Sequence, residues 1–217
     1  FVAQAPRATA FAGRYEPRIF LRGEAQMRAD DWHDVFNALV WLTFPRAKAA
    51  LNARHYGALV RRREAGARNR GPVQDALTLF DEGGVIVATA DAGLGGMLAD
   101  HAWKELFWHS RGNVIERMRF DLFGHALYAK MLGPYAGVTG RGIVCAVNPK
   151  FFGLPLAHQL AELDVRLAEH IADPEHLTQT RELVSVPLLG IPGWCLDNES
   201  AQYYDDSAYF RPPRAAV

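Results

Sequence analysis

Apolar residues recur with helical spacing in two stretches of the chain. The first stretch follows Asp30 and Asp31, either of which is a suitable helix N-cap. Its apolar residues stand at positions i, i+3, i+4, i+7 and i+8, namely Trp32, Val35, Phe36, Leu39 and Val40. The second stretch, residues 156–172, has its apolar stripe at Leu160, Leu163, Leu167 and Ile171. Both stripes predict amphipathic helices that bury one face.

A further helix is predicted between these two from the residues at its ends. Thr43 is a candidate N-cap, and Pro45 fits a first turn, where proline removes no helical hydrogen bond. Alanine-rich sequence continues the helix to about Arg63, and Gly66 and Gly71 follow it. Because only a short connection separates this helix from the one before it, we expect the two to lie antiparallel.

The strands are predicted from short apolar runs bounded by glycine. Residues 76–80 and 85–89 flank Asp81, Glu82 and two glycines, which predicts a β-hairpin with a glycine turn. In that hairpin Asp81 and Glu82 are solvated turn residues, although the two carboxylates also form a possible acid and base pair. The remaining elements expected are strands at 118–123 and 142–147 and helices at 98–108 and 125–131.

Together these elements predict a helix-rich α+β fold in a single domain, with a β-hairpin, a small sheet and an irregular C-terminal tail. Residues 1–29 predict an arm that lies on the core and carries no chemistry, and residues 30–183 form that core. In the tail, residues 184–217, we expect Asp205 or Asp206 to form a salt bridge with Arg211. The aromatic residues expected to anchor the tail are Tyr203, Tyr204, Tyr209 and Phe210.

Composition narrows the classes of function. The 217 residues carry 24 basic and 24 acidic side chains, so no overall charge steers the chain toward nucleic acid or a membrane. Cys145 and Cys195 are too few for a disulfide framework, and their apolar neighbours predict free thiols. There is no apolar run of membrane-spanning length and no signal-peptide pattern, so we expect a cytoplasmic protein.

Local charge is concentrated between residues 46 and 70, where the basic residues face only Glu64. This segment predicts an anion-binding surface for a nucleic acid, a nucleotide or an acidic protein. A solvated helix face is the alternative interpretation. The candidate anion-binding residues are Arg46, Lys48, Arg61, Arg62 and Arg63, and the segment also holds Arg54, Arg68 and Arg70.

Several segments carry a resemblance to a known family. They occur in order along the chain: residues 32–41 (WHDVFNALVW), 44–48 (FPRAK) with Asn52 and His55, 75–82 (DALTLFDE), 123–128 (FGHALY), 189–194 (LGIPGW), 204–206 (YDD) and 210–212 (FRP). With these segments the chain resembles a bacterial family known as domain of unknown function 3025. The resemblance implies no activity.

A group of polar residues on the two predicted N-terminal helices is the main candidate for chemistry. His33 and Asn37 lie four apart and Asn52 and His55 three apart, so each pair shares one helix face. His33, Asp34 and His55, joined by His125 or Asp81, have the ligand types for zinc, manganese or iron. An architectural role, in which these side chains only cross-link the helices by hydrogen bonds, is the alternative.

Catalytic roles are assigned on the same residues. His33, Asp34 and His125 are candidate bases or ligands, while Asn37 and Asn52 would orient substrate or water. At the start of a helix after Gly124, the imidazole of His125 is expected to have a lowered pKa and to be neutral.

An alternative interpretation takes residues 37–43 as a strand before a helix with Asn52 and His55, similar to the ββα element of H-N-H nucleases.

The polar group and the basic segment lead to two expected functions. The first is a metal-dependent hydrolase with a phosphodiester or phosphorylated substrate. The second is a non-enzymatic binding module that binds an anionic partner through residues 46–70.

Overall fold

The computed structural model describes residues 1–4, 10–67 and 69–212. Helices outnumber strands in this part of the chain, which confirms the predicted helix-rich α+β fold. The helices are α1 (Tyr15–Arg22), α2 (Trp32–Thr43), α3 (Pro45–Glu64), α4 (Pro72–Gly83), α5 (Ala92–Ala99), α6 (Arg111–Arg117), α7 (His125–Met131) and α8 (Leu156–Ala172), with a π-helical turn at Glu105–His109. The 3-10 turns are η1 (Phe11–Gly13), η3 (Pro149–Gly153), η4 (Thr180–Glu182), η5 (Leu188–Gly190), η6 (Leu196–Glu199) and η7 (Ala201–Asp205).

The main sheet has four strands in the order β4-β3-β5-β6. Strand β3 runs parallel to β5, with Ile86 opposite Ile143, and antiparallel to β4. All six residues of β3 are buried, as expected for a strand that is covered on both faces. The strands are β3 (Gly84–Thr89), β4 (Met118–Leu122), β5 (Thr139–Ala146) and β6 (Val184–Pro187), and β1 (Val2–Ala3) pairs in parallel with β2 (Gln26–Met27).

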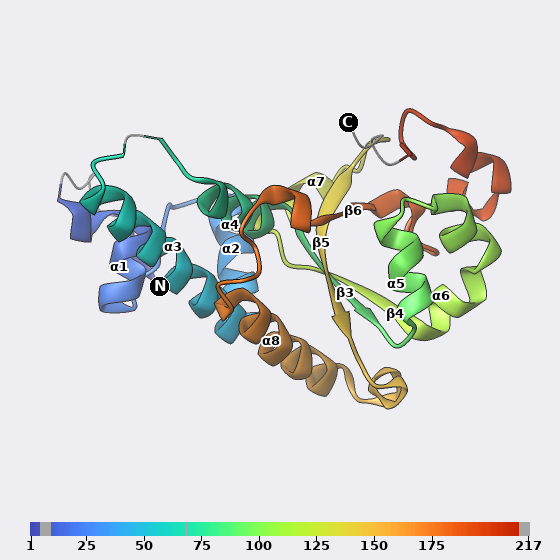
Figure 1. Cartoon of the computed structure of the whole chain (residues 1–217), viewed down its shortest axis with the longest axis horizontal. Helices are drawn as coiled ribbons and strands as arrows, with labels where there is room; N and C mark the ends of the chain where they lie inside the picture. Colours follow the sequence, from blue (N-terminus) through green and yellow to red (C-terminus); the bar gives the residue numbers. More distant parts are fainter. Residues whose placement is uncertain (5–9, 68, 213–217) are drawn as a thin grey trace.

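Helices cover both faces of the sheet (Figure 1). Because side chains alternate along β3, Ile86 and Ala88 pack with α3, α4 and α8, whereas Val85 and Val87 pack with α5 and the C-terminal turns. The first of these two layers, which also holds α1, α2 and α7, carries the polar residues of the candidate site. The N-terminal helices therefore pack on one face of the sheet.

The predicted β-hairpin at residues 76–89 is wrong. Residues 76–80 belong to α4, which begins at Pro72 and buries Ala76, Leu77 and Phe80 on one face. The chain passes from α4 directly into β3, whose antiparallel partner is the distant β4. Gly83 and Gly84 thus mark a helix-to-strand junction, and the apolar spacing of three and four residues overrides the strand pattern.

The predicted ends of three helices agree with the structure and two others need correction. Asp31 caps α2 by accepting from the backbone N–H groups of His33 and Asp34, and α7 and α8 have the predicted bounds. Thr43 does not cap α3, because its hydroxyl donates to the carbonyl of Leu39. Asp164 of α8 accepts instead from the first backbone N–H groups of α3. The helix expected at 98–108 is two elements, α5 and the π-helical turn.

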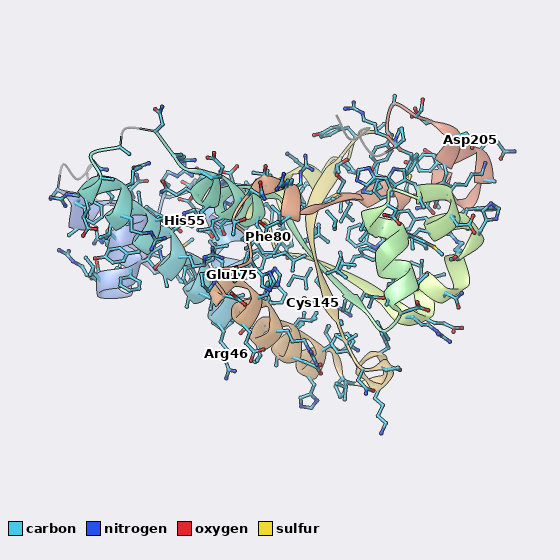
Figure 2. All side chains as sticks on the ribbon, in the orientation of Figure 1. Arg46, His55, Phe80, Cys145, Glu175 and Asp205 are labelled. Carbon is cyan, nitrogen blue, oxygen red and sulfur yellow. The ribbon has the colours of Figure 1, made fainter. Side chains whose placement is uncertain are left out.

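Both terminal segments differ in part from prediction. The N-terminal arm contains a regular helix, α1, which packs on α3. In the tail the aromatic residues act as anchors: the Tyr204 hydroxyl donates to the carbonyl of Gly190, and the Tyr209 hydroxyl donates to that of Val138. The expected salt bridge with Arg211 is wrong: Asp205, labelled in Figure 2, pairs with Lys104 at 2.6 Å, Asp206 accepts from the backbone N–H of Ala208, and the Arg211 guanidinium donates to the carbonyl of Ala208.

The two cysteines lie within the described residues and are both free, as predicted, with Cys145 buried and Cys195 half-buried. Among the helices formed by residues 1–4, 10–67 and 69–212, none combines the length and apolar character needed to cross a bilayer.

Candidate functional site

A polar cleft of about 1140 Å³ lies among the N-terminal helices. It collects residues from the four successive helices α1, α2, α3 and α4 and from α7, which comes about 40 residues later in the sequence. Of the candidates named from the sequence, the cleft is lined by His33, Asp34, Asn37, His55 and His125. The side chain of Asn52 bonds to Glu16, which also lines the cleft. The structure therefore brings the predicted polar group together.

A polar stripe along α3 forms one wall of this site. Lys48, Asn52 and His55 stand at positions i, i+4 and i+7, and all three are buried. The same stripe continues to Arg62, at i+14, which lines the cleft. Residues at these spacings share a helix face, so the wall is continuous from the buried end to the open end. His55 is labelled on α3 in Figure 2.

Lys48 is the most buried of these groups, with 2% of its surface exposed. Its ammonium donates to the Asn37 side-chain oxygen at 2.9 Å and to the Asp81 carboxylate at 2.5 Å. The Asn37 amide in turn donates to the Tyr15 hydroxyl at 2.7 Å. These bonds join α1, α2, α3 and α4, so Asn37 has a structural role as well as a place in the cleft.

Asp81 is a site residue, which corrects its assignment to a solvated hairpin turn. It lies in the last turn of α4, pairs with Lys48 and faces His125. Burial raises the pKa of Asp81, but the Lys48 ammonium, together with His125 and His55, lowers it by more, so the net shift is downward. Asp81 is therefore ionised at neutral pH. Its neighbour Glu82 also lines the cleft.

Two residues of α1 complete the cleft, although the N-terminal arm was expected to carry no chemistry. The Glu16 carboxylate accepts from the Asn52 amide at 2.5 Å. Burial, aided by the negative charge of Asp81, raises the pKa of Glu16 to about 7, against the opposing effects of Asn52 and Lys48. Burial likewise raises the pKa of Tyr15. Nothing in the local sequence marks these residues, because only tertiary packing of α1 on α3 places them.

His33 and His125 meet across the cleft. Their Nε2 atoms are 3.0 Å apart and their rings are edge to face, with an angle of 87° between the planes. His125 reaches this position because α7 starts close against the end of α4. A Cβ atom at Gly124 would lie 2.3 Å from the Gly84 nitrogen, so only glycine permits the approach. Burial lowers the pKa of His125 to about 4, and that of His55 likewise to about 4, so both imidazoles are neutral at pH 7.

The metal-ligand set expected from the sequence is not assembled as such. Among the described residues, the group of three or more possible ligands with all ligand atoms within 4.8 Å of one another is Asp31, His33 and Asp34, without His55. Both carboxylates of this group are engaged by Arg28, at 3.0 Å for Asp31 and 2.8 Å for Asp34. The Arg28 guanidinium also holds the pKa of the Asp34 carboxyl well below its usual range.

The predicted anion-binding residues separate into different environments. Lys48 is buried in its ion pair and is not a surface charge, whereas Arg62 lines the cleft. Arg61 and Arg63 are exposed on the same helix, and the guanidinium of Arg63 lies 5.1 Å from the Phe11 ring centre. Arg46 is in the first turn of α3, whereas His55 is near the middle of the helix, about 14 Å away along the helix axis (Figure 2).

Three further basic residues belong to the cleft, of which only Arg70 was expected from the sequence, as part of the basic segment 46–70. Arg14, Arg28 and Arg70 line it and are exposed to solvent. In the predicted basic segment, Arg54 instead donates to the carbonyl of Ile171 in the last turn of α8 and to those of Asp173 and His176 just beyond it. Arg68 lies outside the described residues.

The H-N-H interpretation is contradicted by the conformation of residues 37–43. They form the second half of α2, which runs without interruption from residue 32 to residue 43. The strand that this nuclease element requires is therefore missing from the position that the interpretation gives it.

One known family matches nearly the whole chain. The family described as "Protein of unknown function (DUF3025)" matches residues 1–214. The chain belongs to this family. Searches of curated proteins and of solved structures found no match. Membership in the family brings no activity with it.

Proposed function

We propose that the cleft is the active site of a hydrolase that acts on a small phosphorylated substrate. The observation that carries the proposal is the combination, in one cleft, of exposed or half-buried arginines with buried or half-buried acid and base groups. Arg14, Arg28, Arg62 and Arg70 supply positive charge, and Glu16, Asp81, His55 and His125 supply titratable groups. Titratable groups with shifted pKa values that gather in one cleft are typical of catalytic sites.

Arginine is suited to phosphate because its planar guanidinium donates two parallel hydrogen bonds to neighbouring oxygens. Arg62 is in the last turn of α3 and Arg70 is in the connection between α3 and α4, and Arg62 also donates to Gln74 at 3.3 Å. The Arg28 guanidinium is already bound by Asp31 and Asp34. Arg62 and Arg70 are therefore the better candidates for direct contact with a phosphate group.

Glu16 is the group that we assign to proton transfer. Its pKa of about 7 makes the ionised and protonated forms similar in population at neutral pH, the best condition for a general base. As the water oxygen bonds to phosphorus, the Glu16 carboxylate takes the water proton. The bond from phosphorus to the ester oxygen breaks, and that oxygen takes up a proton from solvent, giving alcohol and phosphate. Asn52 holds the Glu16 carboxylate in place.

Binding of inorganic phosphate tests the recognition half of the proposal. In the double variant Arg62→Gln/Arg70→Gln, the Kd measured by calorimetry should rise by at least about tenfold, because each charge-assisted hydrogen bond contributes roughly 1.5–3 kcal/mol. The matched control is Arg61→Gln/Arg63→Gln, which removes the same charge from exposed positions beside the cleft and should leave the Kd nearly unchanged.

An equal loss of affinity in both double variants would support the alternative function instead. In that case the exposed face of residues 46–70 binds an anionic partner as a whole, without catalysis, and a steep dependence of the affinity on salt should accompany it. The position of Arg62 and Arg70 beside acid and base groups favours the hydrolase.

Turnover tests the catalytic half. We expect the chain, supplied with divalent metal, to hydrolyse p-nitrophenyl phosphate or bis(p-nitrophenyl) phosphate, and Glu16→Gln to lose at least about 100-fold in kcat, the usual contribution of a general base. Glu64→Gln, at the exposed end of α3, is the control for the change in charge. Equal rates for wild type and Glu16→Gln would rule out the role given to Glu16.

A further inference from the structure

His33 and His125 meet in the cleft, and the two imidazoles alone do not explain their arrangement. His33 comes from the first turn of α2 and His125 from the first turn of α7, and the Nε2 atoms face each other at 3.0 Å. His125 is buried, whereas the side chain of His33 is 46% exposed toward the cleft opening. Anything held between the two nitrogens is therefore accessible to solvent and to a substrate.

The opposite nitrogen of each ring faces a carboxylate. Nδ1 of His33 is 3.4 Å from the Asp34 carboxylate, and Nδ1 of His125 is 3.9 Å from the Asp81 carboxylate. A carboxylate favours the proton on Nδ1, which leaves the lone pair on Nε2. Two such lone pairs that face each other at 3.0 Å repel, unless a proton or a metal ion lies between them.

The Nδ1 atom of His125 is a second sign that the ring is placed for a ligand. This atom is buried, and within the described residues it has no hydrogen-bond partner. The Asp81 oxygen at 3.9 Å is too distant for a hydrogen bond, although the two groups face each other. A small movement of the His125 ring toward Asp81 would form that bond and would widen the gap between the two Nε2 atoms.

The spacing of the nitrogens fits a single ion. With metal–nitrogen distances of about 2.1 Å, two imidazole nitrogens lie about 3.0 Å apart at a right angle and about 3.4 Å apart at a tetrahedral angle. The observed separation is within this range, and the movement toward Asp81 would bring it closer to the tetrahedral value. Imidazole ligands select transition metals such as zinc, manganese or iron over magnesium.

We propose that His33 and His125 bind one divalent transition-metal ion through their Nε2 atoms, with Asp34 and Asp81 orienting the rings. Water and a phosphate oxygen of the substrate take the remaining positions. This assignment replaces the set His33, Asp34 and His55 with a pair that the structure brings into contact. The metal site itself is inferred from the geometry of the two histidines, and only the use of the metal by a hydrolase rests on the proposed function.

Metal binding by the whole chain tests the assignment without any measurement of turnover. After removal of metal, the protein is titrated with Co²⁺, bound metal is counted by elemental analysis, and the visible spectrum reports nitrogen coordination. Wild type should bind one ion per chain. His33→Ala and His125→Gln should each weaken binding by more than about 10- to 100-fold, which is the loss expected when only an outer partner of a ligand is removed. His55→Ala, in the same cleft, should bind like wild type.

Three results would overturn the assignment. Absence of bound Co²⁺ in wild type would leave the pair as a hydrogen bond between two imidazoles. Loss of metal in His55→Ala but not in His125→Gln would restore the set expected from the sequence. Equal binding in all variants would place the ion elsewhere. Because His33 is half exposed, His33→Ala keeps the test valid if the buried His125 variant unfolds. Phosphate binding by the metal-free protein reports on the proposed function separately.

Discussion

Replacing Lys48 with methionine should lower the free energy of unfolding by about 3–5 kcal/mol, because it leaves a carboxylate without its partner in the protein interior. Lys48 is 2% exposed, and its ammonium bonds to both Asp81 and Asn37. The methionine side chain has similar length, so the loss comes from charge and hydrogen bonds more than from volume. Denaturant unfolding at neutral pH measures the effect.

Two comparisons separate this cost from a general effect of removing a lysine. Lys104→Met breaks the exposed pair between Lys104 and Asp205 and should cost less than about 1 kcal/mol. Adding Asp81→Asn to Lys48→Met removes the unpaired charge and should recover part of the lost stability. A loss in Lys48→Met as small as that in Lys104→Met would contradict the burial of a strong ion pair at this position.

The second large effect is the contribution of Glu16 to the pH dependence of stability. The pKa of Glu16 is about 7 in the folded chain and 4.5 for the unperturbed side chain, so between these values Glu16 binds more protons in the folded state than in the unfolded state. The contribution of Glu16 to stability must therefore fall as the pH rises from about 4.5 to about 7, in total by about 3 kcal/mol. Above pH 7 both states are ionised and the contribution is constant.

Glu16→Gln removes this contribution while keeping an oxygen for the Asn52 amide. The stability of the variant relative to wild type should rise by about 3 kcal/mol between pH 4.5 and pH 8, measured by denaturant unfolding at several pH values. The groups that face Glu16 are Asp81 on α4, Lys48 and Asn52 on α3, and Arg70, and all are the same in both proteins. A difference that does not change with pH would show that Glu16 is solvated and unfit for proton transfer.

Local signals in the sequence were sufficient for α2, α3, α7 and α8, but not for α1 and α4, which also line the cleft. An N-cap at Asp31, a first-turn proline at Pro45 and regular apolar stripes placed α2, α3 and α8 within a few residues. Gly124 correctly marked the start of α7. The segment at 76–80 was misread because its short apolar run and the two glycines that follow resemble the first strand and the turn of a hairpin. Its helical signal, Pro72 with Ala76, Leu77 and Phe80 at helical spacing, was also present.

The candidate site was predicted only in part, because only some of its contacts join residues that are close together in the sequence. His33, Asn37, Asn52 and His55 share helix faces, so their meeting follows from two adjacent helices. Tyr15 and Glu16 reach the cleft only through packing of α1 on α3, and no spacing in the sequence records that contact. Lys48 was taken for a surface charge, yet its spacing to Asn52 and His55 placed it on the same inward face.

A crystal soaked with tungstate, a heavy analogue of phosphate, would test whether the cleft binds phosphorylated substrates, because the anomalous signal of tungsten shows where an oxyanion binds. We expect a tungstate in the cleft, within hydrogen-bond distance of Arg62 or Arg70 and on the side of the cleft that holds His33 and His125. Tungstate bound only along the exposed face of Arg61 and Arg63, or absent from the cleft at saturating concentration, would contradict an active site for phosphorylated substrates.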